Sequence, residues 1–555
     1  MKLSKFFSEL FKINTSKLYE FKIDSSDNSF SSTETDLLNG NVLPSLSYNL
    51  DFIKSKYSTY LNSDIVIRDF LLNIKEKNYN AFILYIDGMV DSNSINDFVL
   101  KPLLLKNSLP IQNSCSSTKT KKVIRQALKF NLEDFIYSSL IPQNNIKKYE
   151  TYDEIISCVN SGFCALFVDT LNVAFCIEAK GFKGRSVSVP NNEVIVRGPQ
   201  EAFVENIRIN TSILRKIINN ENLIIENISV GKISKTPVGI CYMKEIANES
   251  LVSEVKYRIN NLGIDYLISS GQLEQLIEDN KGSIYPELIV TERPDKTCTA
   301  LLEGRVVILV NGNPYALIAP GIFIDFLSSP EDYNINPYLA NFLKLLRFIA
   351  SVFAVFLPGL YVAITNFHQE LIPSNLLFAI SSTRENLAFP VIFELIVMEL
   401  SFELLREAGL RVPSPFGSTI GIIGALILGE AAVSANIVSP ILIIIVAFTG
   451  ICSFVIPDFS FSFSVRIFRF LYILLGYIAG FLGISAGFFI HFLILSNSKS
   501  FGVDYFTPYI PFNSISKNES YFLSPIWKRE YRNLFLNTKK PKKEEKISMD
   551  WRKNG

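Results

Sequence analysis

The sequence contains few of the residues that catalytic and metal centres use most. Among 555 residues there are two histidines, His368 and His491, and both lie in or beside apolar segments. The seven cysteines are odd in number and include no C-x-x-C pair, which favours a reducing compartment over a disulfide scaffold or a zinc site. We therefore expect no metal centre, no cofactor and no histidine-based enzyme.

An excess of charge of either sign is missing as well. The chain has 54 Lys and Arg against 53 Asp and Glu, so no global basic field points to nucleic acid. The first 22 residues contain no uninterrupted apolar core followed by a small-residue cleavage site, so the pattern predicts no signal peptide. Whatever precedes the first membrane segment is expected in the cytoplasm.

The apolar residues are unevenly spread, and their distribution predicts the domains. Residues 1–50 are rich in Ser, Asn and Asp and predict a mobile polar arm. From there to residue 332, apolar runs of strand length alternate with amphipathic helical stretches, which predicts a cytoplasmic α/β region. The polar stretch Pro142 to Tyr152 divides it into two subdomains, 51–145 and 146–332. The chain shows no convincing internal repeat.

Several strands of this α/β region can be placed from the sequence. "AFILYIDGMVD", residues 81–91, predicts a buried strand ending in an Asp-Gly turn. "GFCALFVDTLNVAFCIEA", residues 162–179, predicts two strands joined by a tight turn, after a helix at 152–160. "RVVILVNGNPYALIAP", residues 305–320, predicts another hairpin.

Residues 333–500 predict an all-α, multi-pass membrane domain. Four strongly apolar segments occur there: Phe342 to Ile364, Phe416 to Val438, Ile441 to Ile456, and Phe470 to Leu495. A span needs about 20 apolar residues, and the third segment is short for one. With both chain ends in the cytoplasm the number of spans is even, and four is the expected count. Arg466 and Arg469 would then face outward before the last span, which argues against that count.

The basic tail, residues 501–555, follows the last segment. From Lys528 onward, ten Lys or Arg against four Asp or Glu give a net charge of +6. Positive residues are retained on the cytoplasmic side of membranes, and such a tail is suited to contact anionic lipid.

A further apolar segment, "FPVIFELIVMELSFELLREAGLRVP", carries several charges. Helical spacing places Glu399, Glu403, Glu407 and Arg411 on one face. Two interpretations stay open: an interfacial helix with a solvated polar face, or a helix that lines a pore or its vestibule.

The segment 416–438 is the candidate pore helix. Small residues recur every four positions at Gly417, Gly421, Ala425 and Gly429, continuing to Val433, and Glu430 lies beside this face. A carboxylate within an apolar segment marks an ion pathway or a paired site. The alternative is a structural Glu430 bonded to Ser434 or Asn436. The pore-lining candidates are Gly421, Ala425, Glu430 and Val433.

The last apolar segment contains a second small-residue face. Gly476, Gly480, Gly483 and Gly487 share one side of a continuous helix, which predicts close packing between membrane helices. Residues 483–487 also match G-x-S-x-G around Ser485. A nucleophile elbow requires a strand, a turn and a helix, so the hydrolase interpretation is disfavoured.

"VIVRGPQEAFVENIRINTSILRKI", residues 194–217, reads as a strand ending at Arg197, a Gly-Pro turn and a long amphipathic helix that begins at Pro199. Glu205 and Arg208 would be neighbours on the polar side of that helix. Three interpretations stay open: a structural strand-turn-helix, a subunit contact, and an anion site at the helix N-terminus. The subunit-contact candidates are Arg197, Glu205 and Arg208.

This stretch resembles the signature of the A subunit of GerA-type spore germinant receptors. The resemblance continues through "YIDGMVD", "TERPDKTCTALLEGRVVILVNGNPYALIAPGIFIDFLSSPEDY", "LPGLYVAITNFHQELIP", "MELSFELLREAGLRVPSP" and "GALILGEAAVSANIVSP". These blocks occur in order over about residues 80–540. The first 50 residues are not covered by them.

The resemblance implies a non-enzymatic receptor subunit in the inner membrane of bacterial endospores. It implies two partners, a transporter-like B subunit that binds the nutrient and a lipoprotein C subunit. It also implies a homo-oligomeric ring, with a pentamer as the expected size, whose membrane domains form a ligand-gated ion channel. The alternative is a secondary transporter or a membrane protein that binds the nutrient itself.

Overall fold

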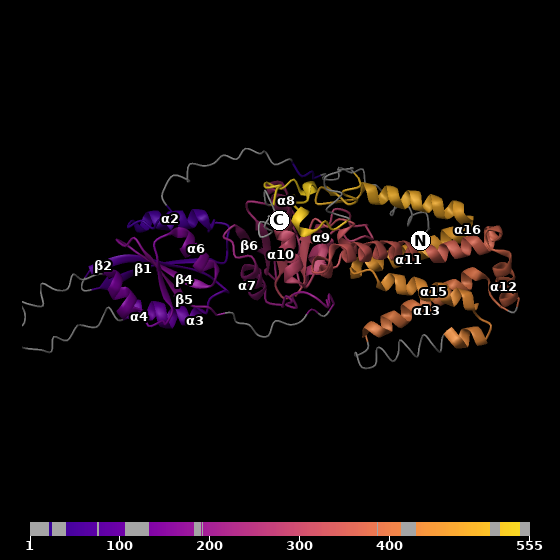
Figure 1. The fold of residues 1–555 in the computed structure, drawn as a ribbon, viewed down its shortest axis with the longest axis horizontal. Coiled ribbons are helices and arrows are strands. Elements are labelled where there is room, and N and C mark those ends of the chain that lie inside the picture. The colour runs from indigo at the N-terminus through magenta and orange to yellow at the C-terminus, as the bar shows by residue number, and fades with distance from the viewer. Residues whose placement is uncertain are drawn as a thin grey trace, which may run out of the picture.

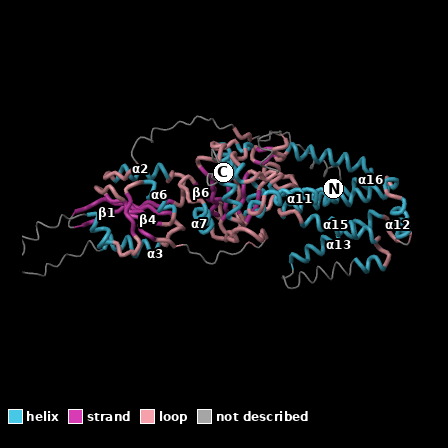
Figure 2. Tube along the Cα trace, viewed as in Figure 1, coloured by secondary structure: helices cyan, strands magenta, loops and turns pink. Residues whose placement is uncertain are grey.

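The computed structural model describes residues 21–24, 40–74, 77–105, 132–181, 190, 192–385, 387–411, 429–510 and 522–543. Two α/β units and a helix bundle follow one another along the long axis of the molecule (Figure 1). Strands are confined to the α/β part, apart from the short β11 (Lys499–Ser500) and β12 (Val503–Asp504), and helices dominate the rest (Figure 2). The predicted fold class is confirmed.

The first unit comprises residues 40–181. Its five strands are antiparallel in the order β1-β2-β4-β5-β3. The strand β4 is buried along its whole length because helices cover both faces of the sheet. The elements are α2 (Leu46–Lys56), β1 (Ile65–Ile74), β2 (Lys77–Ile86), α3 (Ser92–Ile95), η2 (Asn96–Leu100), α4 (Lys101–Leu105), α5 (Leu132–Phe135), η5 (Ile136–Leu140), β3 (Ile146–Tyr149), α6 (Tyr152–Asn160), β4 (Phe163–Val168) and β5 (Ala174–Glu178).

The second unit comprises residues 192–333 and contains the second sheet, ordered β6-β7-β9-β10-β8. Its strand β9 is likewise buried throughout. The elements are α7 (Ile207–Ile217), β6 (Leu223–Val230), β7 (Thr236–Met243), α8 (Glu249–Asn260), α9 (Ser270–Ile277), β8 (Ile289–Thr291), α10 (Pro294–Glu303), β9 (Val306–Val310), β10 (Ala316–Ala319), η6 (Asp325–Leu327) and η7 (Pro330–Tyr333).

Most of the predicted strands are confirmed, but the boundary between the subdomains is wrong. The predicted hairpins are β4 with β5 and β9 with β10, and the helix at 152–160 is α6. However, β3, β4 and β5 complete the first sheet. The first unit therefore ends after β5 and not at residue 145.

The two units are a structural duplication, which the sequence analysis missed. Their strand orders are equivalent, since each strand of one sheet has a counterpart in the other. Asn49 exchanges two hydrogen bonds with the backbone of Leu43, at 2.7 and 3.2 Å. Asn210 does the same with Val204, at 2.6 and 2.8 Å. The same residue type, asparagine, thus makes the same backbone contact in both units, six residues after the group that it binds.

The units are joined by a buried ion pair. Arg215 of α7 donates from Nε and Nη2 to the carboxylate of Asp64, at 2.8 and 2.9 Å, and both side chains are buried. The amide N–H of Ser63 donates to the carbonyl of Ile225 at 3.0 Å. Residues of the first unit therefore cover the edge of strand β6, which would otherwise stay unpaired.

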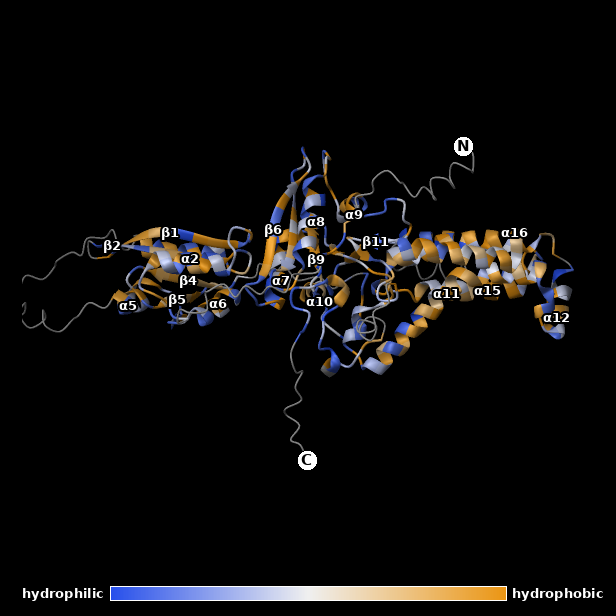
Figure 3. Cartoon of the chain, turned by 90° about the horizontal axis from the view of Figure 1, so that it is seen from above, coloured by the Kyte–Doolittle hydropathy of each residue, from blue (hydrophilic) through white to orange (hydrophobic). Residues whose placement is uncertain are grey.

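The helix bundle follows the second unit, and its long helices are coloured largely as hydrophobic residues (Figure 3). Among the described residues, α11 and α16 are long and apolar enough to cross a membrane, and α15 is apolar but shorter. The helices are α11 (Pro337–Phe367), α12 (Ser374–Arg384), α13 (Val391–Arg411), residues 429–434, α15 (Pro440–Phe454) and α16 (Phe459–Asn497). Short 3-10 turns are η8 (Gln369–Leu371), η9 (Ile526–Lys528) and η10 (Leu534–Leu536).

The single span predicted over Phe470 to Leu495 is wrong, because α16 is a hairpin. Gly480 has φ 57° and ψ −138°, which breaks the helix into two arms, residues 459–479 and 481–497. The arms lie side by side, since the rings of Phe468 and His491 stack at 4.2 Å. A positive φ with this ψ is a conformation that glycine adopts without steric cost.

The predicted count of four spans stays a prediction, but two further helices of the bundle can be oriented relative to each other. At one end of α13 Glu394 accepts the N–H of Ser439, and at the other end Arg406 donates to the hydroxyl of Ser453. The helices α13 and α15 are therefore parallel. Residues 412–428, which connect α13 to the next described helical turn, lie outside the described residues.

Described segments near the two chain ends, residues 21–24 and 537–543, contact the second unit. Lys539 of the tail pairs with Glu249 at 2.6 Å, and Lys543 pairs with Glu303. The carbonyl of Asp24 accepts a hydrogen bond from Asn248 at 2.9 Å. The segments 21–24 and 40–50 are therefore structured, in contrast to the mobile arm predicted there, and the rest of that arm lies outside the described residues.

Replacing Arg215 with alanine is expected to lower the free energy of unfolding of the α/β region by about 3 kcal/mol or more, because Asp64 stays buried without its partner. Arg208→Ala is the matched control, since its pair with Asp87 is half-exposed and costs about 1 kcal/mol or less to remove. Denaturant unfolding of the full-length protein, followed by circular dichroism, measures both. Equal losses in the two variants would contradict this assignment.

Candidate functional site at the junction of the second unit and the helix bundle

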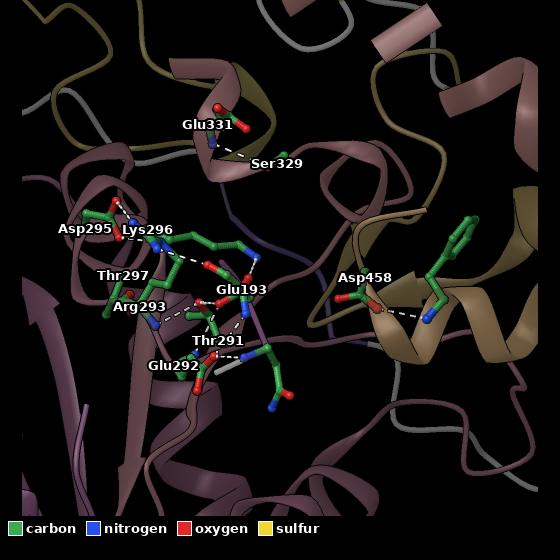
Figure 4. Close-up of polar contacts among 12 residues, drawn as sticks. Glu193, Thr291, Glu292, Arg293, Asp295, Lys296, Thr297, Ser329, Glu331 and Asp458 are labelled. Carbon is green, nitrogen blue, oxygen red and sulfur yellow. Dashed lines mark hydrogen bonds and ion pairs between the residues drawn. The ribbon is translucent and has the colours of Figure 1, made fainter. Parts of the chain in front are cut away.

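The fully buried Arg293 holds both ends of one exposed loop, residues 193–199. Its guanidinium donates to the carbonyls of Glu193 at 3.1 Å and Pro199 at 2.6 Å. Asp295 fixes the guanidinium through two further bonds, at 3.0 and 2.9 Å. The "TERPDK" stretch, residues 291–296, thus sets the shape of a loop that lies about a hundred residues earlier in the chain (Figure 4).

Glu193 connects the same loop to α10 and faces the start of α16. Its carboxylate accepts from Lys296 at 2.8 Å and from the hydroxyl of Thr291. Asp458 caps α16 by accepting the N–H of Phe461 at 2.8 Å (Figure 4). Burial raises the pKa of Asp458, and the positive charge of Lys296 opposes that shift. The loop therefore lies where the second unit meets the bundle.

A second buried carboxyl group occupies this junction. The carboxylate of Glu287 accepts the N–H groups of Asp279 at 2.7 Å and Asn280 at 3.2 Å. Burial, reinforced by the nearby charge of Asp279, raises the pKa of Glu287 to about 8. Its backbone carbonyl accepts from the hydroxyl of Ser500 at 2.6 Å, just after the hairpin.

The top of the loop is exposed and apolar. The exposed fractions of Val194 and Val196 are 71% and 90%, and Arg197 beside them forms no ion pair among the described residues. Gly198 has φ 145°, and a side chain there would collide with Ile195 and Asn334. The loop is thus a rigid support for two valines and one arginine.

The helix that follows begins later than predicted. Its N-cap is Asn206, whose side chain accepts the N–H of Arg208 at 2.9 Å, so α7 does not begin at Pro199. The strand predicted to end at Arg197 is also absent, because residues 194–197 have no strand pairing. The interpretation as an anion site required a helix N-terminus at Pro199, and no helix begins there.

The other two contact candidates lie apart from this loop. Glu205 is exposed and precedes the helix, so the predicted pair with Arg208 does not form. Arg208 instead pairs with Asp87 of the first unit. Within a single chain, this ion pair joins the second unit to the first.

Of the pore candidates, Gly421 and Ala425 lie outside the described residues. Glu430 and Val433 belong to the helical residues 429–434, where Glu430 is exposed and Val433 is partly buried. The hydroxyl of Ser434 donates to the backbone carbonyl of Glu430 at 2.7 Å. The Ser434 hydroxyl is therefore bonded to the backbone of Glu430 and not to its side chain.

The polar face of α13 is turned inward at Glu399 and Glu403, so the solvated interfacial helix is wrong for that half of the face, whereas Glu407 and Arg411 are exposed. Glu399 pairs with Arg469 of the first α16 arm at 2.6 Å, and both side chains are 0% exposed. Glu403 pairs with Arg466 at 2.9 Å. Sequence reasoning named these residues but missed the pairing; the signal was an equal number of carboxylates and arginines in two apolar segments.

The four predicted packing glycines do not share one face, because Gly480 forms the hairpin turn. A side chain on Gly476 would lie 2.4 Å from the carbonyl of Gly359 in α11. One on Gly483 would lie 2.3 Å from the carbonyl of Leu475, and Gly487 also lies against Leu475. Ser485 is in the second arm and donates to the carbonyl of Leu482 at 3.0 Å, so its G-x-S-x-G motif lies within a helix and has no preceding strand.

Comparison with known proteins gives a consistent result. Residues 51–535 match the family described as Bacillus/Clostridium GerA spore germination protein. The chain is 36% identical to spore germination protein KA of Bacillus subtilis over 491 residues, which cover 88% of this chain and 86% of that protein. It is 34% identical to spore germination protein A1 of the same species, over 87% of this chain and 92% of that protein.

Among solved structures, one similar chain is the N-terminal domain of the A subunit of the Bacillus megaterium spore germinant receptor GerK3. It is 32% identical, with a TM-score of 0.37, and the match covers 51% of this chain and 97% of that one. From the family match and the extent of the relatives, the chain belongs to the Bacillus/Clostridium GerA family of spore germination proteins.

Proposed function

We propose that the chain is the A subunit of a nutrient germinant receptor in the inner membrane of the endospore. It forms a homo-oligomeric ring, with a pentamer as the expected size, and the ring conducts ions when the receptor is activated. A transporter-like B subunit binds the nutrient, and a lipoprotein C subunit completes the receptor. The similarity to spore germination proteins KA and A1 supports the receptor role.

The observation that supports the channel is the position of Glu430. Its side chain is exposed on the bundle, next to Ala431, Ala432 and Val433, and forms no ion pair among the described residues. A carboxylate that faced lipid there would be costly. Assembly around a central axis removes this charge from lipid and places it in water, where it attracts cations.

The braced loop 193–199 is the proposed contact between neighbouring subunits. Its shape is fixed by Arg293, so the exposed Val196 and Arg197 need no ordering when a partner binds. Preorganised apolar and arginine side chains are typical of interface centres. A rigid loop beside the helix bundle is well placed to fix the relative position of two subunits.

Glu430→Gln is expected to reduce the cation selectivity of the purified oligomer, because the negative charge near the axis is lost. The reversal potential across a planar bilayer with a potassium chloride gradient should move toward zero. Glu407→Gln is the control, since Glu407 is exposed and paired with Arg411 in α13. An unchanged selectivity, or no potassium current from the wild-type oligomer, would refute the assignment.

Arg197→Ala is expected to weaken subunit assembly while each chain stays folded. The mass distribution of the purified protein should shift toward monomer, and its circular dichroism should stay unchanged. Lys232→Ala provides the control, because Lys232 is likewise an exposed cation, on the turn after β6. If Arg197→Ala unfolds the chain, the loop is structural; if assembly is unaffected, it is not a contact.

A further inference from the structure

Tyr285 connects the second unit to both arms of the α16 hairpin. It lies between α9 and β8 and is buried against the bundle. Its ring stacks on Phe468 of the first arm at 5.1 Å and on His491 of the second arm at 5.5 Å. One side chain of the α/β region therefore contacts two helices that run in opposite directions.

The hydroxyl of Tyr285 continues this contact as a chain of hydrogen bonds. It lies 2.9 Å from Nε2 of His491, and Nδ1 of the same ring lies 3.0 Å from the hydroxyl of Tyr472. In a neutral imidazole one nitrogen donates and the other accepts, so the two hydroxyls take opposite roles. Loss of one hydroxyl leaves a buried ring nitrogen unpaired, which is unfavourable.

Tyr472 extends the chain to α11 through a close backbone contact. A side chain on Gly359 would lie 2.6 Å from the carbonyl of Tyr472, so the two helices touch there. Gly359 follows Pro358, which has no N–H to donate to the carbonyl of Ala354. Nε of Arg469, nearly one turn before Tyr472, donates to that carbonyl at 3.0 Å.

We propose that Tyr285, His491 and Tyr472 couple the α/β region to the turn of α11 that contains Pro358 and Gly359. This coupling controls the conducting state of the bundle. In the closed state the two hydrogen bonds tie the second unit to both arms of the hairpin, whose residue Tyr472 lies against Gly359 of α11. A movement of the second unit that withdraws Tyr285 breaks the first bond and releases the hairpin. This inference rests on the proposed channel function and names the residues that link the two parts of the protein.

The test is the potassium current of the purified full-length oligomer in a planar bilayer without any nutrient. Tyr285→Phe keeps the stacked ring and removes the hydroxyl, so the closed state loses one hydrogen bond. The open fraction should rise by about fivefold, the usual effect of one such bond. Tyr472→Phe should have a similar effect, because it removes the second bond to the same imidazole.

Tyr505→Phe is the matched control. Tyr505 belongs to the same aromatic cluster, with its ring 6.4 Å from that of Tyr285, and its buried hydroxyl has no hydrogen-bond partner among the described residues. Removing this hydroxyl should leave the current unchanged. Thermal unfolding of each variant checks that the fold is retained.

The double variant Tyr285→Phe with Tyr472→Phe separates coupling from independent effects. Because both hydroxyls act through His491, the double variant should open less than the product of the two single effects. Independent multiplication, or a Tyr285→Phe current equal to that of Tyr505→Phe, would overturn the coupling alone. A wild-type oligomer without current would overturn the proposed channel and the coupling with it.

Discussion

The buried guanidinium of Arg469 is the constraint on which the helix bundle depends. It joins three helices, because it lies in α16, pairs with Glu399 of α13 and donates to the carbonyl of Ala354 in α11. That carbonyl has no donor within its own helix, since Pro358 occupies the position four residues later. In an apolar bundle an unpaired carbonyl and an unpaired carboxylate are each costly, so one arginine satisfies two groups at once.

The contacts between these arginines and carboxylates explain the distribution of polar and apolar side chains in the bundle. With Glu399 and Glu403 turned inward to Arg469 and Arg466, α13 presents Leu404 outward, with an exposed fraction of 70%. The bond from Arg469 to the carbonyl of Ala354 also fixes the register of α16 on α11, so that Gly476 meets Gly359 at a distance only glycines allow. Charges set the alignment, and small residues then permit backbone contact.

The sequence predicted the elements whose pattern is local and failed where pairing is distant. The hairpins β4 with β5 and β9 with β10 follow from apolar runs around turn residues. The α16 hairpin could not be distinguished from one span, because a tight turn at Gly480 interrupts no apolar run. Arg293 and Glu193 lie a hundred residues apart, so the bracing of the loop depends on the sheet that brings them together. Hydropathy also cannot show that the carboxylates of α13 have arginine partners.

The duplication of the α/β region lets the contacts of the two units with the bundle be compared. Both units contain the asparagine whose side chain bonds to the backbone six residues earlier, Asn49 in one and Asn210 in the other. The shared fold alone therefore does not explain why the two units make different contacts. The second unit adds the loop braced by Arg293 and the aromatic contact of Tyr285. The first unit contacts the second through the buried pair of Asp64 and Arg215. The contacts that connect the first unit to the helices therefore run by way of α7 and the second sheet.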